Sequence, residues 1–288
     1  MRLYRRAGAL AMVWALAAAG VPCFSAGRAA AQDIRIPSPL NPRLRPDPPN
    51  LRNTMLVRVL TADDDPPFNF ALPDGTLAGY NIDLARALCL ELKIACTIQA
   101  RRFDTLADAL GKGEGDAVIA SLAPTGGDRA RVGFTMPYLP LPARFAAKRG
   151  DKREEIVPSP AVLAGRTVGV VAGSAHAAFL ERLFPAAVRK PFDTLAALED
   201  ALAQGAVEFA FADAANLAFW LNGTRAAECC AFVGGAYLEP NLFGPGHAVA
   251  LRADNDTLRR AFDWALMRLD ARGALAELYL RYFPVPLF

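Results

Sequence analysis

The first third of the chain switches between the two-residue period of strands and the longer period of helices. Residues 55–61 alternate apolar and polar side chains, which predicts a first strand, and the acidic turn Asp63–Asp65 follows it. From residue 80 to 93 the apolar side chains fall on one face of a helix. Residues 94–98 resume a strand pattern. The predicted order of strand, helix and strand is the unit of a parallel sheet with helical crossovers.

The next segment places a strand end against a helix start. A second helix is predicted over 103–112, capped by Asp104. The unbroken apolar run Ala117–Ala120 then predicts a strand covered on both faces, ending at Ser121. A short polar helix is predicted to start near Gly126. Because the first N–H groups of a helix have no partner within it, this junction is typical of a site for an anionic or polar ligand.

A second series of elements follows a polar interruption. Residues 139–165 carry charges and prolines and predict a domain boundary. A strand, a Gly-Ser turn and a helix are predicted from 166 to about 184. Another helix is predicted over Leu195–Gln204 with Thr194 as its cap, and a strand over Val207–Ala212 ends at Asp213 before a further helix.

The two halves therefore repeat one plan. In each half a buried strand delivers a polar side chain, Ser121 or Asp213, at its carboxyl end, where open α/β sheets bind ligands. Two such lobes facing each other would form a cleft. A return strand is predicted over 248–252, and two helices, over 256–269 and 272–283, close the chain with apolar stripes that belong to a core.

Composition places the chain among globular proteins. Of its 288 residues, 53% are hydrophobic and 21% charged. This is enough apolar material for one large or two medium domains, and it excludes a disordered or low-complexity protein. The proline-rich residues 32–53 are the exception, because such a segment cannot bury a core, and they predict an exposed leader.

The first 31 residues have the layout of an export signal. Three arginines precede an apolar run, and small residues end at Ala29–Ala31, so cleavage is predicted after Ala31. A membrane anchor is the alternative, but the run is barely of spanning length. Removing residues 1–31 takes away four arginines and no acids, which leaves 28 basic and 29 acidic residues. The resulting net charge of −1 gives no indication of nucleic-acid binding.

Four cysteines remain after cleavage, and an even number in an exported chain suggests disulfides. Cys89, near the end of a predicted helix, and Cys96, early in the next strand, are close enough for a disulfide, with two buried free thiols as the alternative. A bridge between the adjacent Cys229 and Cys230 would be strained, and the sequence leaves it open. No cysteine or histidine cluster indicates a metal site.

Seven segments, taken together and in order, resemble the bacterial family 3 solute-binding proteins, the periplasmic receptors of polar amino-acid ABC importers. They run from about residue 55 to the C-terminus, and no single segment is decisive. The segments are Asp64–Phe70, Gly79–Ala85, Phe103–Leu106, Gly115–Ala120, Phe134–Tyr138, Val168–Ser174 and Glu208–Asp213.

The resemblance implies an α/β type II periplasmic binding protein, whose two lobes are joined by a two-strand hinge with the ligand cleft between them. It implies a periplasmic monomer without a cofactor that closes on a small polar solute, an amino acid or a related cationic amine, and delivers it to an ABC permease in the inner membrane. The spacing of Cys89 and Cys96 resembles the disulfide of the histidine- and lysine/arginine/ornithine-binding members. The expected boundaries are 1–31 for the signal peptide, 32–53 for the leader, 54–143 and 247–288 for lobe 1, and 144–246 for lobe 2.

Site residues also follow from the resemblance. Ser121 and the backbone N–H of Ala123 would meet a ligand carboxylate, and Phe103 would form an apolar wall. Ser174 would lie in the anion loop of lobe 2. Asp213 would pair with the α-ammonium group, and this charge-assisted contact would anchor a small ligand.

Two positions depart from the family pattern. The family usually carries Thr-x-x-Arg at the start of the polar helix, and the same spacing from Thr125 falls here on Asp128, with Arg129 one residue later. One residue turns a helical side chain by about 100°, so Arg129 is a candidate rather than an exact match, and Asp128 fits a capping pattern. Asp65 stands where the family usually has an aromatic residue, which favours a cationic ligand, although acidic turns are commonly just solvated.

Two other classes of function compete with transport. Some relatives of this family are dehydratases, but the sequence shows no paired carboxylates or base placed for such chemistry. A sensor or accessory protein that binds a ligand without a transporter is the second alternative. The sequence predicts a binding protein and does not identify its ligand.

Overall fold

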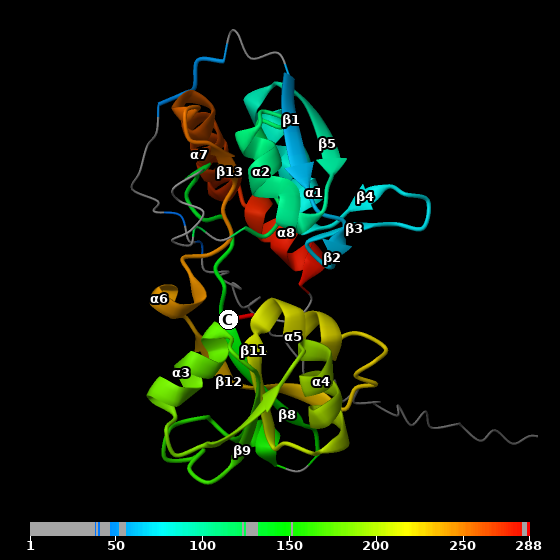
Figure 1. Ribbon diagram of the computed structural model, residues 1–288, viewed down its shortest axis with the longest axis vertical. Coiled ribbons are helices and arrows are strands. Elements are labelled where there is room, and N and C mark those ends of the chain that lie inside the picture. The colour runs from blue at the N-terminus through cyan, green and yellow to red at the C-terminus, as the bar shows by residue number, and fades with distance from the viewer. Residues whose placement is uncertain are drawn as a thin grey trace, which may run out of the picture. The chain divides into compact units, whose positions relative to one another are not determined.

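The computed structural model describes residues 38, 40, 47–51, 56–122, 124, 132–150, 152–283 and 287–288 (Figure 1). The predicted signal peptide and its cleavage site lie outside the described residues, as do Ala123, the predicted polar helix near Gly126, and Arg129.

The first sheet combines strands from both ends of the described chain. Its order is β5-β1-β6-β13-β7, with β1 parallel to both β5 and β6, and β13 antiparallel to β6 and β7. The late strand β13 is therefore inserted between two early ones. The bounds are β1 Leu56–Thr61, β5 Ala95–Ala100, β6 Ala117–Val118, β7 Val132–Phe134 and β13 Ala250–Arg252.

The second sheet is built from the middle of the chain, in the order β10-β9-β11-β8-β12. Strand β9 pairs in parallel with β10 and β11, whereas β8 runs antiparallel to β11 and β12. Its bounds are β8 Ala143–Lys148, β9 Thr167–Val171, β10 Val188–Phe192, β11 Phe209–Asp213 and β12 Cys230–Tyr237.

Helices cover these sheets, and a small third sheet, β2-β3-β4, follows β1. The largest core cluster joins α1, α7 and α8 to the first sheet, and separate clusters fill the second. The small sheet comprises β2 Asp64–Asp65, β3 Asn69–Ala71 and β4 Leu77–Ala78; the helices are α1 Tyr80–Leu92, α2 Leu106–Gly111, α3 Ala175–Leu183, α4 Leu195–Gln204, α5 Ala214–Leu221, α6 Pro240–Phe243, α7 Asp256–Ala271 and α8 Ala274–Tyr282, with 3-10 turns at Phe103–Thr105 and Arg153–Glu155.

Local chemistry fixes several helix starts. Thr194 accepts a hydrogen bond from the backbone N–H of Ala197 at 3.1 Å, as the sequence predicts, and Asn255 caps α7 in the same way. Helix α1 begins after Gly79, whose φ of 123° and close approach to the Phe68 carbonyl leave no room for a Cβ.

Some sequence-based expectations were wrong. Asp104 does not cap the second helix: its carboxylate binds Arg102, and a 3-10 turn precedes α2. No strand was expected in residues 139–165, yet they contain β8, an interior strand of the second sheet, while the domain boundary predicted there stays a prediction. The leader is not wholly exposed, since Leu40 is buried in the main core cluster.

Both cysteine pairs are bonded. Cys89 in α1 is joined to Cys96 in β5, which confirms the predicted disulfide between helix and sheet. The adjacent Cys229 and Cys230 are also joined, at the start of β12.

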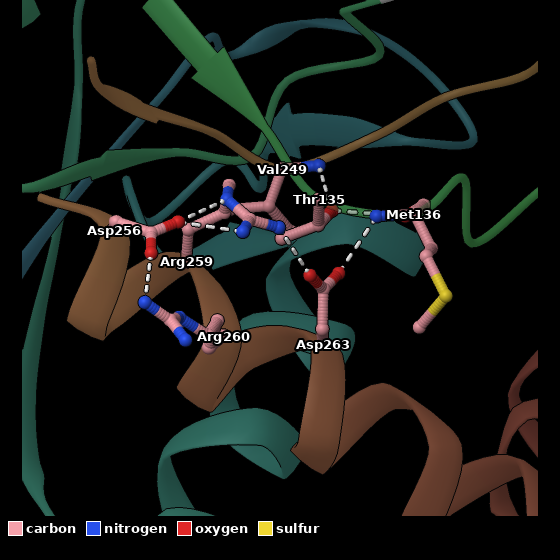
Figure 2. A network of polar contacts seen from close by, with 7 residues as sticks. All are labelled: Thr135, Met136, Val249, Asp256, Arg259, Arg260 and Asp263. Atoms are coloured by element: carbon pink, nitrogen blue, oxygen red, sulfur yellow. Dashed lines mark hydrogen bonds and ion pairs between the residues drawn. The ribbon is translucent and has the colours of Figure 1, made fainter. Parts of the chain in front are cut away.

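A buried polar network holds the chain where it leaves β7 (Figure 2). Asp263 of α7 accepts a hydrogen bond from the backbone N–H of Met136 and pairs with Arg259. Thr135 donates to the Met136 carbonyl and accepts from the backbone N–H of Val249. These bonds tie the segment leading to the second sheet onto α7 and the approach to β13.

Candidate ligand-binding site

Ser121 follows β6 at the carboxyl end of the first sheet. Its φ of 58° lies in the left-handed region, which costs a non-glycine residue energy and persists where surrounding contacts impose it. The side chain is half-buried, and its Oγ accepts a hydrogen bond from Asn81 Nδ2 at 3.1 Å. Ser121 is therefore held in place by Asn81, a residue of α1 that lies 40 positions earlier in the chain.

A buried polar cluster lies beneath Ser121. Asn81, at the start of α1, donates from Nδ2 to Asn69 Oδ1 at 2.7 Å and accepts at Oδ1 from the Tyr138 hydroxyl at 2.8 Å. Asn69, Asn81 and Tyr138 are all at most 2% exposed. Burial and the nearby Tyr80 hold the pKa of Tyr138 well above its usual range, so this hydroxyl stays protonated and can donate.

Asp65 of β2 borders the same cluster. It pairs across the small sheet with Asn69 and is half-buried. Burial raises the pKa of Asp65, and the neighbouring charge of Asp64 adds to the rise, while a hydrogen bond from the Ser121 side chain opposes it. The structure thus brings the predicted residues Asp65 and Ser121 together.

Asp213 ends β11 and caps α5. Its Oδ1 accepts the backbone N–H of Asn216 at 2.9 Å. Burial, with a smaller contribution from the charge of Asp65, raises its pKa to about 6, against hydrogen bonds from the backbone of Asn216 and Ala215. This carboxylate carries its charge at an energetic cost that a cation would relieve.

The remaining predicted residues stand apart from this group. Phe103 is 48% exposed and lies in the 3-10 turn before α2. Ser174 caps α3: its Oγ accepts from the backbone N–H of Ala177 and donates to the carbonyl of Val171 at 2.7 Å. Within the described residues neither side chain forms a hydrogen bond or ring contact with Asp65, Ser121 or Asp213.

Sequence reasoning assigned no role to Asn69, Asn81 or Tyr138. All three lie in segments that carry the family resemblance, and a polar residue in a predicted buried position is a signal that a partner is required. The pairing itself depends on contacts between positions up to 57 residues apart, which no local pattern reports.

The described residues include no group of three or more His, Cys, Asp or Glu side chains that could hold a metal ion. No helix in the described ranges combines the length and hydropathy needed to cross a membrane.

The structure contains two α/β sheets, and the first sheet takes strands that come before and after those of the second sheet in the chain. Polar side chains stand at the strand ends. This arrangement defines a two-lobed solute-binding protein. The chain belongs to the bacterial extracellular solute-binding proteins, family 3, whose family model matches residues 57–285. The predicted family, type II fold and solute-binding function are confirmed by this match.

Known proteins agree with the assignment. The chain is 32% identical over 229 residues to the L-arginine-binding protein of Pseudomonas aeruginosa, covering 79% of this chain and 87% of that protein. It matches a Salmonella typhimurium periplasmic binding protein of high arginine specificity with a TM-score of 0.55 and 26% identity, over 80% of this chain and all of that one. The open L-cystine receptor of Neisseria gonorrhoeae shares the fold, with a TM-score of 0.71 at 20% identity over 82% of this chain and 96% of that chain.

Proposed function

We propose that this protein is the periplasmic substrate-binding component of an amino-acid ABC importer, and that its ligand is a cationic amino acid of the arginine class. Two of the similar proteins, one from Pseudomonas aeruginosa and one from Salmonella typhimurium, are named for the binding of arginine. The observation that carries the ligand class is a second carboxylate beside the one assigned to the α-ammonium group: burial, with a smaller contribution from the charge of Asp65, raises the pKa of Asp213 to about 6, and burial also raises the pKa of Asp65. A bound cation would stabilise both carboxylates.

Each site residue has a proposed role. Asp213 receives the α-ammonium group, as a charge-assisted contact in a partly dry site. The ligand carboxylate is assigned to Ser121, to the backbone N–H of Ala123 and to Arg129. Asp65 and Phe103 flank the side chain of the ligand, and Ser174 fixes the loop before α3, since its hydroxyl is engaged in capping.

The domain limits and the cellular setting belong to the same proposal. We place lobe 1 at 54–143 and 247–288 and lobe 2 at 144–246, and the strand membership of the two sheets supports these limits except at Ala143, the first residue of β8. The signal peptide ends after Ala31, the mature chain acts as a monomer, and an inner-membrane permease receives the ligand.

The test is calorimetric titration of the chain without residues 1–31 with L-arginine, L-lysine, L-histidine, L-glutamine and the diamine putrescine. The proposal expects binding of cationic amino acids, weaker binding of L-glutamine, and loss of affinity in Asp213→Asn. Binding of putrescine alone would show that the carboxylate of the ligand is not recognised. Binding of L-glutamine with equal strength would remove the cationic assignment.

The alternatives make different predictions. A dehydratase would convert the bound compound, so unchanged L-arginine after prolonged incubation supports binding without chemistry. A sensor or accessory protein would bind the amino acid without a transporter. Stimulation of ATP hydrolysis by a permease encoded beside the gene, reconstituted in vesicles with the loaded protein, separates transport from that role.

A further inference from the structure

A cavity of about 370 Å³ is lined mainly by α4, α5 and the turn that follows α5. This volume lies within the range of small-molecule sites. None of the described residues that the proposed function assigns to the amino-acid ligand is among its lining residues. The cavity is therefore a candidate for a separate binding site.

The walls of the cavity are largely aromatic and apolar. Trp220 of α5 is 4% exposed and belongs to a core cluster that also takes side chains from α4 and the second sheet. Its neighbour Phe219 is 51% exposed, and Leu195 and Pro66 add further apolar surface. Such walls fit the apolar body of a ligand, and the faces of aromatic rings also attract cations.

A buried carboxylate also lines the cavity. Glu199 of α4 is 5% exposed, and a carboxylate in such a place is costly unless it is paired. Its Oε2 accepts a hydrogen bond from Arg225 Nη1 at 3.2 Å, whereas its Oε1 forms no hydrogen bond with a described residue. Asn216 adds a carboxamide to the lining, which supplies another acceptor.

The charges around Glu199 do not balance within this group. Arg225 also pairs through Nη2 with Asp200 at 2.9 Å, so one guanidinium serves two carboxylates and the three groups carry a net charge of −1 when ionised. Burial raises the pKa of Glu199 to about 7 against the opposing charge of Arg225, and the charge of Asp200 adds to the rise. A further cation in the cavity would stabilise the ionised form of Glu199.

The turn that carries Arg225 is fixed in place. Ala226 is 1% exposed and belongs to the same core cluster as Trp220. Ala227 and Glu228 follow with φ values of 46° and 58°, in the left-handed region that non-glycine residues keep only where surrounding contacts impose it. Arg225 is thus held beside Glu199 and Asp200, and Glu199 Oε1 is left for a ligand.

We propose that this cavity is a second binding site, selective for a small primary amine with an aromatic body. Glu199 Oε1 and the carboxamide of Asn216 receive the ammonium group, and Phe219 and Trp220 pack against the body. An ammonium group has three donors and no acceptor, so it matches these two oxygens. The site goes beyond the proposed function, because it takes a different ligand from the amino-acid site.

The experiment uses three probes that share a phenyl body: phenethylamine is cationic, 2-phenylethanol is neutral and 3-phenylpropanoate is anionic. Removing residues 1–31 leaves Trp220 and Trp264, and Trp264→Phe then makes Trp220 the only indole. In this parent chain, Trp220 fluorescence and calorimetry follow each titration at about pH 8, where Glu199 is ionised. We expect phenethylamine to bind at least about tenfold more tightly than 2-phenylethanol, as for one charge-assisted contact, and 3-phenylpropanoate to bind most weakly.

Two substitutions in α4 test the role of Glu199. Glu199→Gln keeps the shape of the side chain and should lose most of the preference for phenethylamine, with the affinity for L-arginine unchanged. Asp200→Asn is the matched control, because Asp200 pairs with the same guanidinium but does not line the cavity and its side chain is 59% exposed. Water screens its charge, so the loss should be much smaller. Equal losses would show a general attraction to negative charge and overturn the inference.

Asp213→Asn separates the two sites. It should weaken the binding of L-arginine and leave the binding of phenethylamine unchanged, whereas loss of both would place the amine in the amino-acid site and overturn the inference. A parent that binds L-arginine but not phenethylamine, or binds 2-phenylethanol equally well, overturns this inference alone. A parent that binds phenethylamine but no amino acid contradicts only the proposed function.

A second variant keeps the inference testable if Glu199→Gln fails to fold. Phe219→Ala removes a half-exposed ring from the cavity wall and should weaken phenethylamine binding several-fold. An unchanged affinity in Phe219→Ala would count against the inference.

Discussion

The carboxylate of Asp263 accepts a hydrogen bond from the backbone N–H of Met136 at 2.7 Å, although 127 positions separate the two residues (Figure 2). The other oxygen of Asp263 pairs with Arg259 at 2.7 Å, and the residue is only 7% exposed. Met136 lies between β7 and the second sheet. Helix α7 thus fixes the path of the backbone where the chain leaves the first sheet.

Asp263→Ala should destabilise the protein by about 2–3 kcal/mol, because it leaves the partly buried backbone N–H of Met136 and one nitrogen of the Arg259 guanidinium without their acceptor. Asp256→Ala is the matched control on the same helix. Asp256 also pairs with Arg259 and with Arg260, but its side chain is 49% exposed and water screens these pairs, so we expect a much smaller loss. Urea unfolding measures both, and equal losses would contradict the central position of Asp263.

Elements with a complete local signal were predicted well from the sequence. Helix α4 has its bounds and its Thr194 cap as expected, and Asp213 stands at the end of β11. Strand β8 was missed because the polar and proline-rich residues after it dominate the pattern of 139–165. Strand β10 was missed because most of its side chains are exposed, which removes the apolar run that marks a buried strand.

The candidate site could be predicted only in part. A polar residue at a strand end is visible in sequence, so Ser121 and Asp213 were found. The roles of Asn81 and Tyr138 arise from tertiary contacts that bring the start of α1 and the segment after β7 beneath Ser121. Asp104 is an example of a local signal that misleads. Its residue type suits a helix cap, but its carboxylate bonds to Arg102 instead.

Two substitutions of Asp213 should separate its structural role from its ligand role. Asparagine is an equally good N-cap, so Asp213→Asn should keep the stability of α5 but lose at least about tenfold in affinity for L-arginine. Asp213→Ala should lose the affinity and also about 1 kcal/mol of stability. Calorimetry and thermal unfolding measure the two effects. Full affinity in Asp213→Asn would show that Asp213 is only a cap.

The affinity for a cationic ligand should fall as the solution is acidified. The pKa of Asp213 is raised to about 6, and that of Asp65 is raised in the same direction, so both carboxylates protonate at milder acidity than usual. A bound cation favours the ionised form, and binding therefore releases protons. Affinity for L-arginine should be constant above about pH 7 and decline below about pH 6.

In the ligand-free protein, Asp213 should affect stability in the opposite direction, so that its contribution is larger at low pH than at neutral pH. A folded-state pKa above the unfolded value means that the folded state binds the extra proton, so the contribution of Asp213 to stability falls as pH rises from about 4 to about 6. The increase in melting temperature caused by L-arginine should accordingly grow over this range. If L-arginine raised the melting temperature equally at about pH 5 and about pH 7, the proposed contact between Asp213 and the ligand would be contradicted. In Asp213→Asn the increase in melting temperature should depend less on pH.

Ser174 and Thr194 offer a matched pair of caps, at α3 and α4. Each side chain accepts an N–H bond at 3.1 Å, so Ser174→Ala and Thr194→Ala should each cost about 1 kcal/mol in urea unfolding. Ser174 also donates to the carbonyl of Val171, which leaves its hydroxyl no proton for a ligand. Loss of affinity for L-arginine in Ser174→Ala alone would therefore come from a displaced loop before α3, whereas unchanged affinity in both variants would remove Ser174 from the site.

The two disulfides should contribute unequally to stability. The Cys89–Cys96 bond closes a loop between α1 and β5 with a sequence separation of 7, and the chain-entropy argument gives it about 2–3 kcal/mol. The bond between the adjacent Cys229 and Cys230 restricts much less of the unfolded chain, so it should contribute less. The variants Cys89→Ser with Cys96→Ser, and Cys229→Ser with Cys230→Ser, are compared by urea unfolding under oxidising conditions. A larger loss in the second variant would show that the packing of Cys230, which is 1% exposed and belongs to the same core cluster as Trp220, outweighs loop closure.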